Sequence, residues 1–349
     1  MPSISTTDAQ GLQTKMILDF YKERNKPTGF LRAMFPDKVA PTLELSIEVQ
    51  RGSEKIAVDV VRGTDGNRNQ ITRSTEKIWI PPYFREWFDA TSLQLYDRLY
   101  GATEINDQIF TAYINSVADA MVDIKSKIER RYELMCSQVL ETGIVTLVNG
   151  TNIDFKRKSA SLVNLGAGNY WATAGVDPYA QIEALCNFVR TSGKYSGPYF
   201  NLVLGSTALS DLLRNSEFLK RQNLFSMTLD QVAAPLRNSE GAALHGEITC
   251  GAYKVRLWSY PQFYEDASGT LVPYINPKKA ILLPETPQFR FGFAAVPQLI
   301  TPGAAPKTGA YIFGDIIDQR AKAHIYEVES AGMPIPLAID QMATIQPVA

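Results

Sequence analysis

The chain has 349 residues, of which 45% are hydrophobic and 20% are charged, and its formal net charge at pH 7 is −1. This composition is ordinary for a globular protein with a sizeable core, and the length is enough for two domains. A near-zero charge argues against a protein whose main task is to grip nucleic acid non-specifically, since such proteins carry a basic balance.

We expect a cytoplasmic product that does not contact a membrane. The first ten residues contain neither a basic segment nor an apolar core, so no signal peptide is predicted. No apolar run reaches the roughly 18 residues of a membrane-spanning helix. Cys136, Cys186 and Cys250 are widely spaced and form no CxxC pair. This spacing favours buried thiols in a reducing compartment.

The first 40 residues predict an arm rather than a domain. Thr14–Arg24 has a weak helical pattern, and Pro27, Pro36 and Pro41 interrupt the chain after it. We expect this arm to lie as a strap over another part of the molecule.

A β ribbon is predicted from Glu44 to Trp87. Leu45, Ile47 and Val49 alternate with polar residues, as in a half-buried strand. The tip, Arg62–Asn69, is rich in turn-forming residues, and the return strand ends at Pro81. Because a two-stranded ribbon is marginal in water, something else must cover its apolar face.

The glycine-rich tip of the ribbon invites comparison with a phosphate-binding loop. That chemistry requires a helix N-terminus directly after the loop, whose N–H groups face the anion. Here a strand follows Arg62–Asn69, and no Gly-Lys-Ser/Thr sequence is present. The tip is therefore interpreted as a solvated hairpin turn.

The strongest helix is predicted over Thr103–Thr142, with Thr103 as the N-cap and Gly143 at the C-terminal end. A helical stripe runs through it, formed by Ile105, Ile109, Tyr113, Val117, Met121, Ile124, Ile128, Met135 and Val139. At about 1.5 Å per residue the helix would be on the order of 60 Å long. One compact domain could not easily enclose it.

A small α/β layer is predicted in the middle of the chain. A hairpin with Asn149-Gly150 at its turn spans Ile144–Lys158, and Ser159–Gly175 is interpreted as a loop of small residues. Asp177-Pro178 opens a helix whose buried stripe is predicted at Ile182, Leu185, Cys186 and Val189. The apolar strand Tyr199–Leu204 leads into another helix. One strand between two helices is typical of such a layer.

The remaining chain is predicted to be mainly β. Leu224–Glu247 is interpreted as a long loop. Short strands follow at Tyr253–Tyr260, Val272–Ile275 and Ala280–Leu283. From Ala321 the chain is β again, with a turn near Gly332-Met333-Pro334 and a closing strand over Pro336–Val348.

The sequence predicts no catalytic, metal-binding or cofactor-binding residue. His245 and His324 are its only histidines, and no GxSxG motif is present. Glu327 and Glu329 share one face of a strand and are expected to face solvent. Lys156-Arg157-Lys158 is interpreted as a strand edge protected by charge, with DNA contact as the alternative.

The order of arm, ribbon, long helix, hairpin, α/β unit and closing strands resembles the major capsid proteins of tailed phages, which have the Hong Kong ninety-seven fold. Within that group the chain resembles the phage lambda major head protein (capsid protein E) family. Four stretches carry the resemblance: RGTDGNRNQITR (Arg62–Arg73), GPYFNLVLGSTALSDLLRNSEFLKRQN (Gly197–Asn223), GAYKVRLWSYPQFYEDASGTLVPYINPKKAILLPETPQFRFGFA (Gly251–Ala294) and the closing hairpin VESAGMPIPLAIDQMATIQPV (Val328–Val348).

The resemblance implies an α+β fold with an N-terminal arm (1–41), an extended loop (42–90), a peripheral domain with the spine helix (91–175 and 310–349) and an axial domain (176–309). It also implies hexamers and pentamers that tile an icosahedral head around double-stranded DNA. Implied partners are a separate scaffolding protein, a portal, a decoration protein and DNA contacted weakly on the inner face. The expected location is the virion, assembled in the host cytoplasm.

We expect an adjacent subunit, rather than the chain itself, to cover the ribbon's apolar face. The predicted contact residues are Arg51, Arg62, Asp65, Arg68, Arg73 and Trp79. Two alternatives remain: an encapsulin-like nanocompartment shell, or a soluble α/β enzyme using Ser206 or Cys186. The scarcity of histidine argues against the enzyme.

Overall fold

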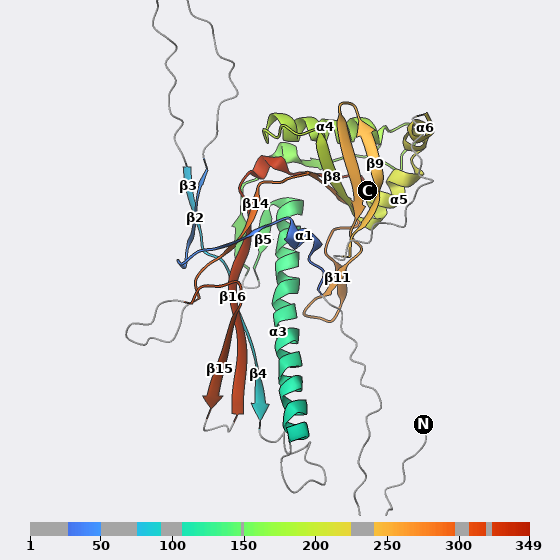
Figure 1. Ribbon diagram of the computed structural model, residues 1–349. Coiled ribbons are helices and arrows are strands. Elements are labelled where there is room, and N and C mark those ends of the chain that lie inside the picture. Colours follow the sequence, from blue (N-terminus) through green and yellow to red (C-terminus); the bar gives the residue numbers. More distant parts are fainter. Residues whose placement is uncertain are drawn as a thin grey trace, which may run out of the picture. The chain divides into compact units, whose positions relative to one another are not determined.

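The computed structural model describes residues 27–49, 75–91, 107–147, 150–224, 241–296, 307–318 and 323–349. These residues form two compact units. Unit 1 comprises the described residues of Arg85–Ile128 and Phe313–Glu329. Unit 2 comprises those of Thr28–Phe84, Glu129–Ile312 and Ser330–Ala349. Figure 1 labels the elements named below.

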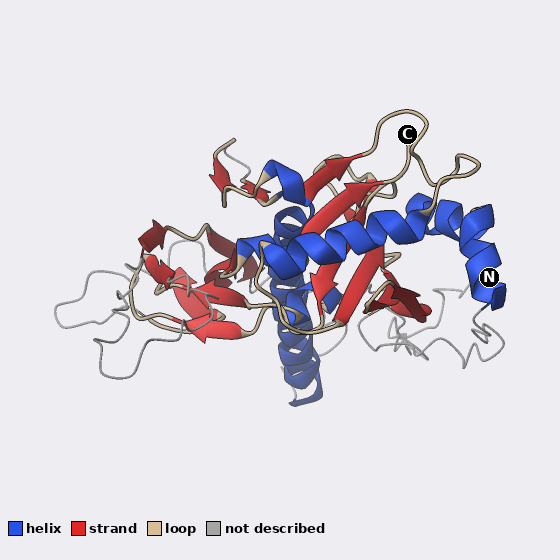
Figure 2. Ribbon diagram, turned by 90° about the horizontal axis from the view of Figure 1, so that it is seen from above, coloured by secondary structure: helices blue, strands red, loops and turns tan. Residues whose placement is uncertain are grey.

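The main core of unit 2 lies against a six-stranded sheet. Its strands, in spatial order, are β7 (Leu162–Asn164), β17 (Ala343–Gln346), β13 (Ala280–Pro284), β8 (Tyr199–Leu204), β10 (Tyr253–Ser259) and β9 (Ala243–Cys250). Helix α4 (Pro178–Thr191) lies across these strands, as Figure 2 shows. Its residues Ile182, Cys186 and Val189 are fully buried, which confirms the predicted stripe.

Local capping fixes the helices around this sheet. Asp177 caps α4 by accepting a hydrogen bond from the Tyr179 N–H at 3.0 Å, as its sequence predicts. Helix α5 (Ser206–Arg214) follows β8, and Asn215 separates it from α6 (Ser216–Leu224). The Asn215 side-chain oxygen accepts hydrogen bonds from two N–H groups of α6, each at 2.9 Å.

The long helix α3 spans Asp107–Thr142. Its 36 residues correspond to about 54 Å, which confirms the predicted helix over this range. The predicted cap at Thr103 lies outside the described residues. Gly143 ends the helix with φ of +77°, a conformation that favours glycine.

A hairpin of β5 (Ile144–Thr146) and β6 (Asn152–Asp154) follows α3, as predicted. The next residues are not a protected strand edge, because Arg157 is half-buried and bonds to backbone carbonyl groups. Its guanidinium donates hydrogen bonds to the carbonyl oxygens of Leu140 at 2.8 Å, Ser161 at 3.1 Å and Met342 at 3.2 Å. Burial lowers its pKa to about 10. Arg157 thus ties the end of α3 to the 3₁₀ turn η1 (Ser159–Ser161) and to the chain before β17.

The end of the N-terminal arm is part of the fold of unit 2. It contains α1 (Phe30–Ala33) and β1 (Asp37–Val39), and β1 pairs in parallel with β14 (Phe289–Phe293). The ring of Phe35 stacks on Phe289 with 4.8 Å between centroids. These residues confirm a strap, while Thr14–Arg24 lies outside the described residues.

A second sheet has five strands in the order β1-β14-β16-β15, and β4 (Tyr83–Thr91) also pairs with β16. Strand β15 spans Ile312–Asp318, and β16 spans Ala323–Pro336. Two hairpins complete the fold: β2 (Leu45–Val49) with β3 (Thr75–Trp79), and β11 (Phe263–Glu265) with β12 (Leu271–Pro273). The first confirms the base of the predicted ribbon.

The predicted closing hairpin is wrong. Strand β16 runs through Pro334 without turning, and β17 pairs with β7 and β13 instead. Proline is tolerated because Pro334 lies opposite Phe291, whose N–H points to the Pro36 carbonyl on the other side. Phe291 and Pro334 are therefore a non-hydrogen-bonded pair, so the missing proline N–H costs no bond to β14.

Three further boundaries were also wrongly predicted. The predicted loop Leu224–Glu247 ends earlier, because β9 begins at Ala243. The predicted small-residue loop Ser159–Gly175 contains β7, which is paired with β17. The predicted ribbon ends before Trp87, which belongs to β4 in the five-stranded sheet. Strands β7 and β4 pair with strands distant in sequence, β17 and β16, whereas β9 forms a hairpin with the adjacent β10.

Candidate assembly surfaces

The described residues contain no group of three or more side chains suited to a metal ion. The Nε2 atom of His245 lies 2.7 Å from Ser259 Oγ, and burial lowers the pKa of this histidine. His324 lies between Asp315 and Tyr326, each 3.1 Å from one of its ring nitrogens. No described helix is long and apolar enough to cross a membrane.

Most of the predicted contact residues lie outside the described residues: Arg51, Arg62, Asp65, Arg68 and Arg73. Trp79 is described and is half-buried at the end of β3. Its ring lies 5.5 Å from that of Phe155 in the same chain. The role of all six residues in subunit contacts remains a prediction.

The two faces of the β2–β3 ribbon differ at its base. Leu45 is only 5% exposed. It lies against Gly292, where an added Cβ would come within 2.5 Å of the Leu45 Cδ1 atom. For this residue the expectation that only another subunit covers the apolar face is wrong. Ile78 and Ile80 are both more than half exposed, so an apolar surface still remains at the base.

Strand β4, which the sequence analysis missed, has two distinct faces. Phe88 stacks on Tyr326 of β16, with 5.5 Å between centroids, and Ala90 is buried. Residues of the opposite parity are exposed, including Trp87, which is 56% exposed. The sequence signal was the alternation in YFREWFDA, but apolar residues at both parities obscured which face is buried.

An ion-pair cluster lies on the exposed face of β4. Arg85 donates to Glu327 Oε2 from Nε at 2.8 Å and from Nη2 at 2.5 Å, and its Nε lies 3.6 Å from Glu329. The expectation that the two glutamates simply face solvent is wrong, since Glu327 is buried. A Cβ at Gly314 would lie 2.9 Å from the Glu327 carboxylate, so glycine leaves room for this pair.

Strand β15 stands at the end of the strand order and carries a further apolar surface. Phe313 and Ile317 are four residues apart, so they share a face of the strand. Both are more than half exposed, and Ile317 is 70% exposed. An exposed, apolar edge strand favours association with another chain.

Helix α3 has an exposed apolar stripe besides the predicted one. Ile114, Ala118 and Val122 recur every four residues and are all exposed. The predicted stripe is confirmed at Ile124, Ile128, Met135 and Val139, which are buried, whereas Val117 and Met121 are half-buried. Sequence periodicity alone missed the second stripe because it is narrow and Ala118 is small.

The exposed surfaces of β4, α3 and β15 belong to unit 1, whereas the ribbon base with Ile78 and Ile80 belongs to unit 2. Among the described residues of unit 1, the exposed large apolar side chains are Trp87 on β4, Ile114 and Val122 on α3, and Phe313, Ile316 and Ile317 on β15. Single exposed apolar residues need no explanation, whereas gathered ones mark interaction sites. This unit has the features of a protein completed by neighbouring chains.

The sequence pattern of the phage major capsid protein E family matches residues 14–346. The chain belongs to this family. It is therefore a structural component of the virion, and it assembles into an oligomeric shell. The match favours the phage shell over the encapsulin-like compartment, and it places this capsid protein in a family of structural proteins. A comparison with curated proteins found no match.

Solved structures confirm the fold of the capsid protein. A prophage protein from Escherichia coli CFT073, described as a capsid protein, is 13% identical with a TM-score of 0.60, over 92% of this chain and 93% of that one. The mature capsid of bacteriophage PhiM1 is 8% identical with a TM-score of 0.53, over 99% and 96%. The capsid of a native GTA particle is 11% identical with a TM-score of 0.51, over 99% of each. The expected α+β, Hong Kong ninety-seven fold is confirmed.

Proposed function

We propose that this capsid protein forms the hexamers and pentamers of an icosahedral head that encloses the double-stranded DNA of a tailed phage. One observation within the chain supports this most strongly. Trp87, Phe313 and Ile317 of unit 1 are more than half exposed although they are large and apolar. Neighbouring copies would remove these side chains from water, at a gain of about 25 cal/mol per Å² of apolar surface.

The predicted regions have separate roles in this proposal. The loop 42–90 reaches a neighbouring subunit, and Arg51, Arg62, Asp65, Arg68, Arg73 and Trp79 contribute to that contact. The peripheral domain (91–175 and 310–349) joins copies side by side. The axial domain (176–309), which contains most of the six-stranded sheet, forms the centre of each capsomer. The arm 1–41 lies as a strap over another part of the molecule.

The proposed partners are a separate scaffolding protein, a portal and a decoration protein, with assembly in the host cytoplasm. Contact with packaged DNA on the inner face is weak in this proposal. The net charge of −1 provides no general attraction for phosphate. The run Lys156-Arg157-Lys158 is also not fully presented to a partner, because Arg157 is half-buried and Lys158 pairs with Asp340 at 2.8 Å.

The test is a double substitution, Arg62→Ala with Arg68→Ala, in the full-length protein. We expect the thermal unfolding of the unassembled subunit to be unchanged, whereas the yield of shells in negative-stain electron microscopy falls. A charge-matched control, Arg214→Ala with Lys220→Ala on α5 and α6, changes a surface outside the loop. Normal shell yield and head stability in the first variant would contradict the proposed role of the loop.

A further inference from the structure

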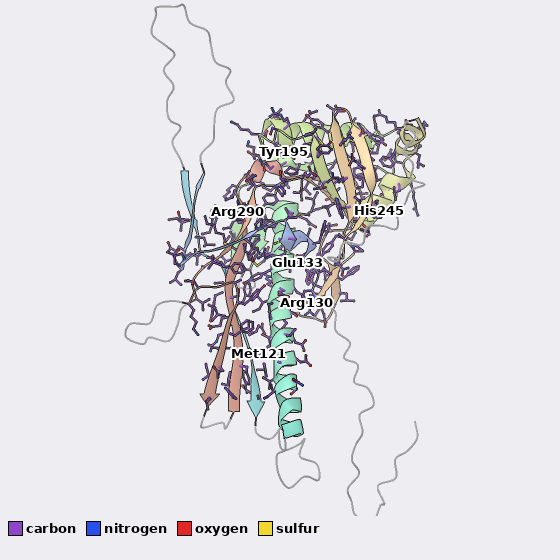
Figure 3. All side chains as sticks on the ribbon, viewed as in Figure 1. Met121, Arg130, Glu133, Tyr195, His245 and Arg290 are labelled. Atoms are coloured by element: carbon purple, nitrogen blue, oxygen red, sulfur yellow. The ribbon has the colours of Figure 1, made fainter. Side chains whose placement is uncertain are left out.

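The short helix α1 is capped by a side chain from a distant part of the sequence. Gly29 precedes the helix and has no side chain with which to cap it. Instead, Glu133 of α3 accepts hydrogen bonds from the Leu31 N–H at Oε1 and the Arg32 N–H at Oε2, each at 2.9 Å. Figure 3 labels Glu133 on α3, level with α1. A single carboxyl group therefore satisfies two backbone donors at the base of the arm.

This carboxyl group is nearly removed from water. Glu133 is 1% exposed. Phe30 closes the site against Trp258 and Tyr260, with 5.6 Å and 5.4 Å between ring centroids. The Thr28 hydroxyl lies 2.6 Å from the Tyr260 hydroxyl. Burial of Glu133 thus depends on the arm being in place.

Charged and titratable groups that interact with Glu133 come from several elements: Arg32 from α1, Cys136 from α3, Tyr260 after β10 and Tyr274 after β12. Arg32 is the cation among them, but its guanidinium contacts other groups. It pairs with Asp37, donates to the Phe35 carbonyl and lies 3.7 Å from the ring centroid of Phe291. Among the described residues Glu133 has no salt bridge.

We propose that Glu133 is a proton-controlled latch, which holds the base of the N-terminal arm on the long helix when protonated and loosens it when ionised. If α1 moved away from α3, the two N–H donors would lose their acceptor and the carboxyl group would be exposed to water. The geometry therefore couples the protonation of Glu133 to the position of α1. A carboxylic acid can still accept from the backbone donors, and its O–H can donate to the Tyr260 oxygen that faces it.

The direction of the pH effect follows from the state of the carboxyl group in the two arm positions. Burial raises the pKa of Glu133 to about 7, and this effect outweighs the hydrogen bonds from Leu31 and Tyr260 that lower it. A solvated glutamate has a pKa of about 4.3. Docking of the arm is therefore accompanied by uptake of a proton between these two pKa values. The resulting stabilisation of the docked state is fully present below about pH 4 and is lost as the pH rises through about 7.

Hydrogen–deuterium exchange of the full-length protein between pH 6 and pH 8 tests the latch. After correction for intrinsic exchange, the protection of the Leu31 and Arg32 amides should fall about tenfold over this interval. In Glu133→Gln, which resembles the protonated group, their protection should be independent of pH. Glu129→Gln, one turn earlier on α3, is the matched control and should retain the wild-type slope.

An internal reference keeps the test decisive even if a variant does not fold. The Tyr179 amide of the same protein is also capped by a carboxylate, that of Asp177 on α4. If the corrected protection of Leu31 and Arg32 in wild type follows that of Tyr179 across the interval, the latch is ruled out. A Glu133→Gln slope equal to wild type would also overturn it. All these readouts lie within one chain and do not depend on shell formation.

Discussion

The six-stranded sheet of unit 2 and the exposed surfaces of unit 1 differ in whether the chain itself buries their large apolar side chains. Around the six-stranded sheet, large side chains such as Trp171, Phe200 and Leu282 are buried by the chain itself. In unit 1, Trp87 and Ile317 are of similar size and remain exposed. The first region is stable by its own packing. We propose that other copies of the chain complete the second region by covering it.

The sharpest way to test this comparison is to remove a similar apolar side chain from each region. Leu282→Ala should destabilise the unassembled subunit by about 4 kcal/mol, because Leu282 is fully buried and a cavity would remain. Ile317→Ala should change its stability by less than about 0.5 kcal/mol, since Ile317 is 70% exposed. It should instead reduce shell yield. Urea unfolding and electron microscopy measure the two effects. Equal losses of stability would remove the distinction between the regions.

A second comparison concerns arginines. Arg157→Ala should destabilise the subunit by about 3 kcal/mol, because the carbonyl groups of Leu140, Ser161 and Met342 would lose a partly buried, charged donor. The neighbouring Lys156 is exposed, and Lys156→Ala is the control, with an expected change below about 0.5 kcal/mol. Similar urea midpoints for the two variants would show that Arg157 is not the structural tie that we describe.

A smaller effect than those of Leu282→Ala and Arg157→Ala is expected for Arg85→Ala in unit 1. Its ion pair with Glu327 is short, but the Arg85 side chain is 47% exposed, so water and salt screen the interaction. We expect a loss of about 0.5–1 kcal/mol in the unassembled subunit, decreasing with added salt. A loss above about 3 kcal/mol, independent of salt, would mean that this face is already buried as in unit 2.

Elements with strong local signals could be predicted from the sequence. Asp177-Pro178 with its apolar stripe identified α4, and Asn149-Gly150 identified the β5–β6 hairpin. Elements defined by distant partners could not. Strand β7 has three residues and depends on β17, which lies far along the chain. Likewise, the prolines of β16 favoured a turn when only local sequence was considered. The pairing with β14, in which these prolines are tolerated, cannot be read from the sequence.

The candidate surfaces show the same limit. The family resemblance identified the shell function, yet the exposed residues of β4 and β15 were not predicted, because local alternation does not reveal which face the fold buries. Glu133 left only a weak signal. It stands three and seven residues before Cys136 and Leu140, which are both buried, so it is a charged residue on an apolar face. Its partners in α1 are about 100 residues away.

The central claim is that neighbouring copies complete unit 1, and electron cryomicroscopy of assembled particles tests it most directly. In a particle map at side-chain resolution, we expect density of adjacent subunits in contact with Trp87, Phe313 and Ile317. A well-ordered shell in which these three side chains face solvent would contradict the account, as would a full-length protein that remains a stable monomer with its scaffolding partner present.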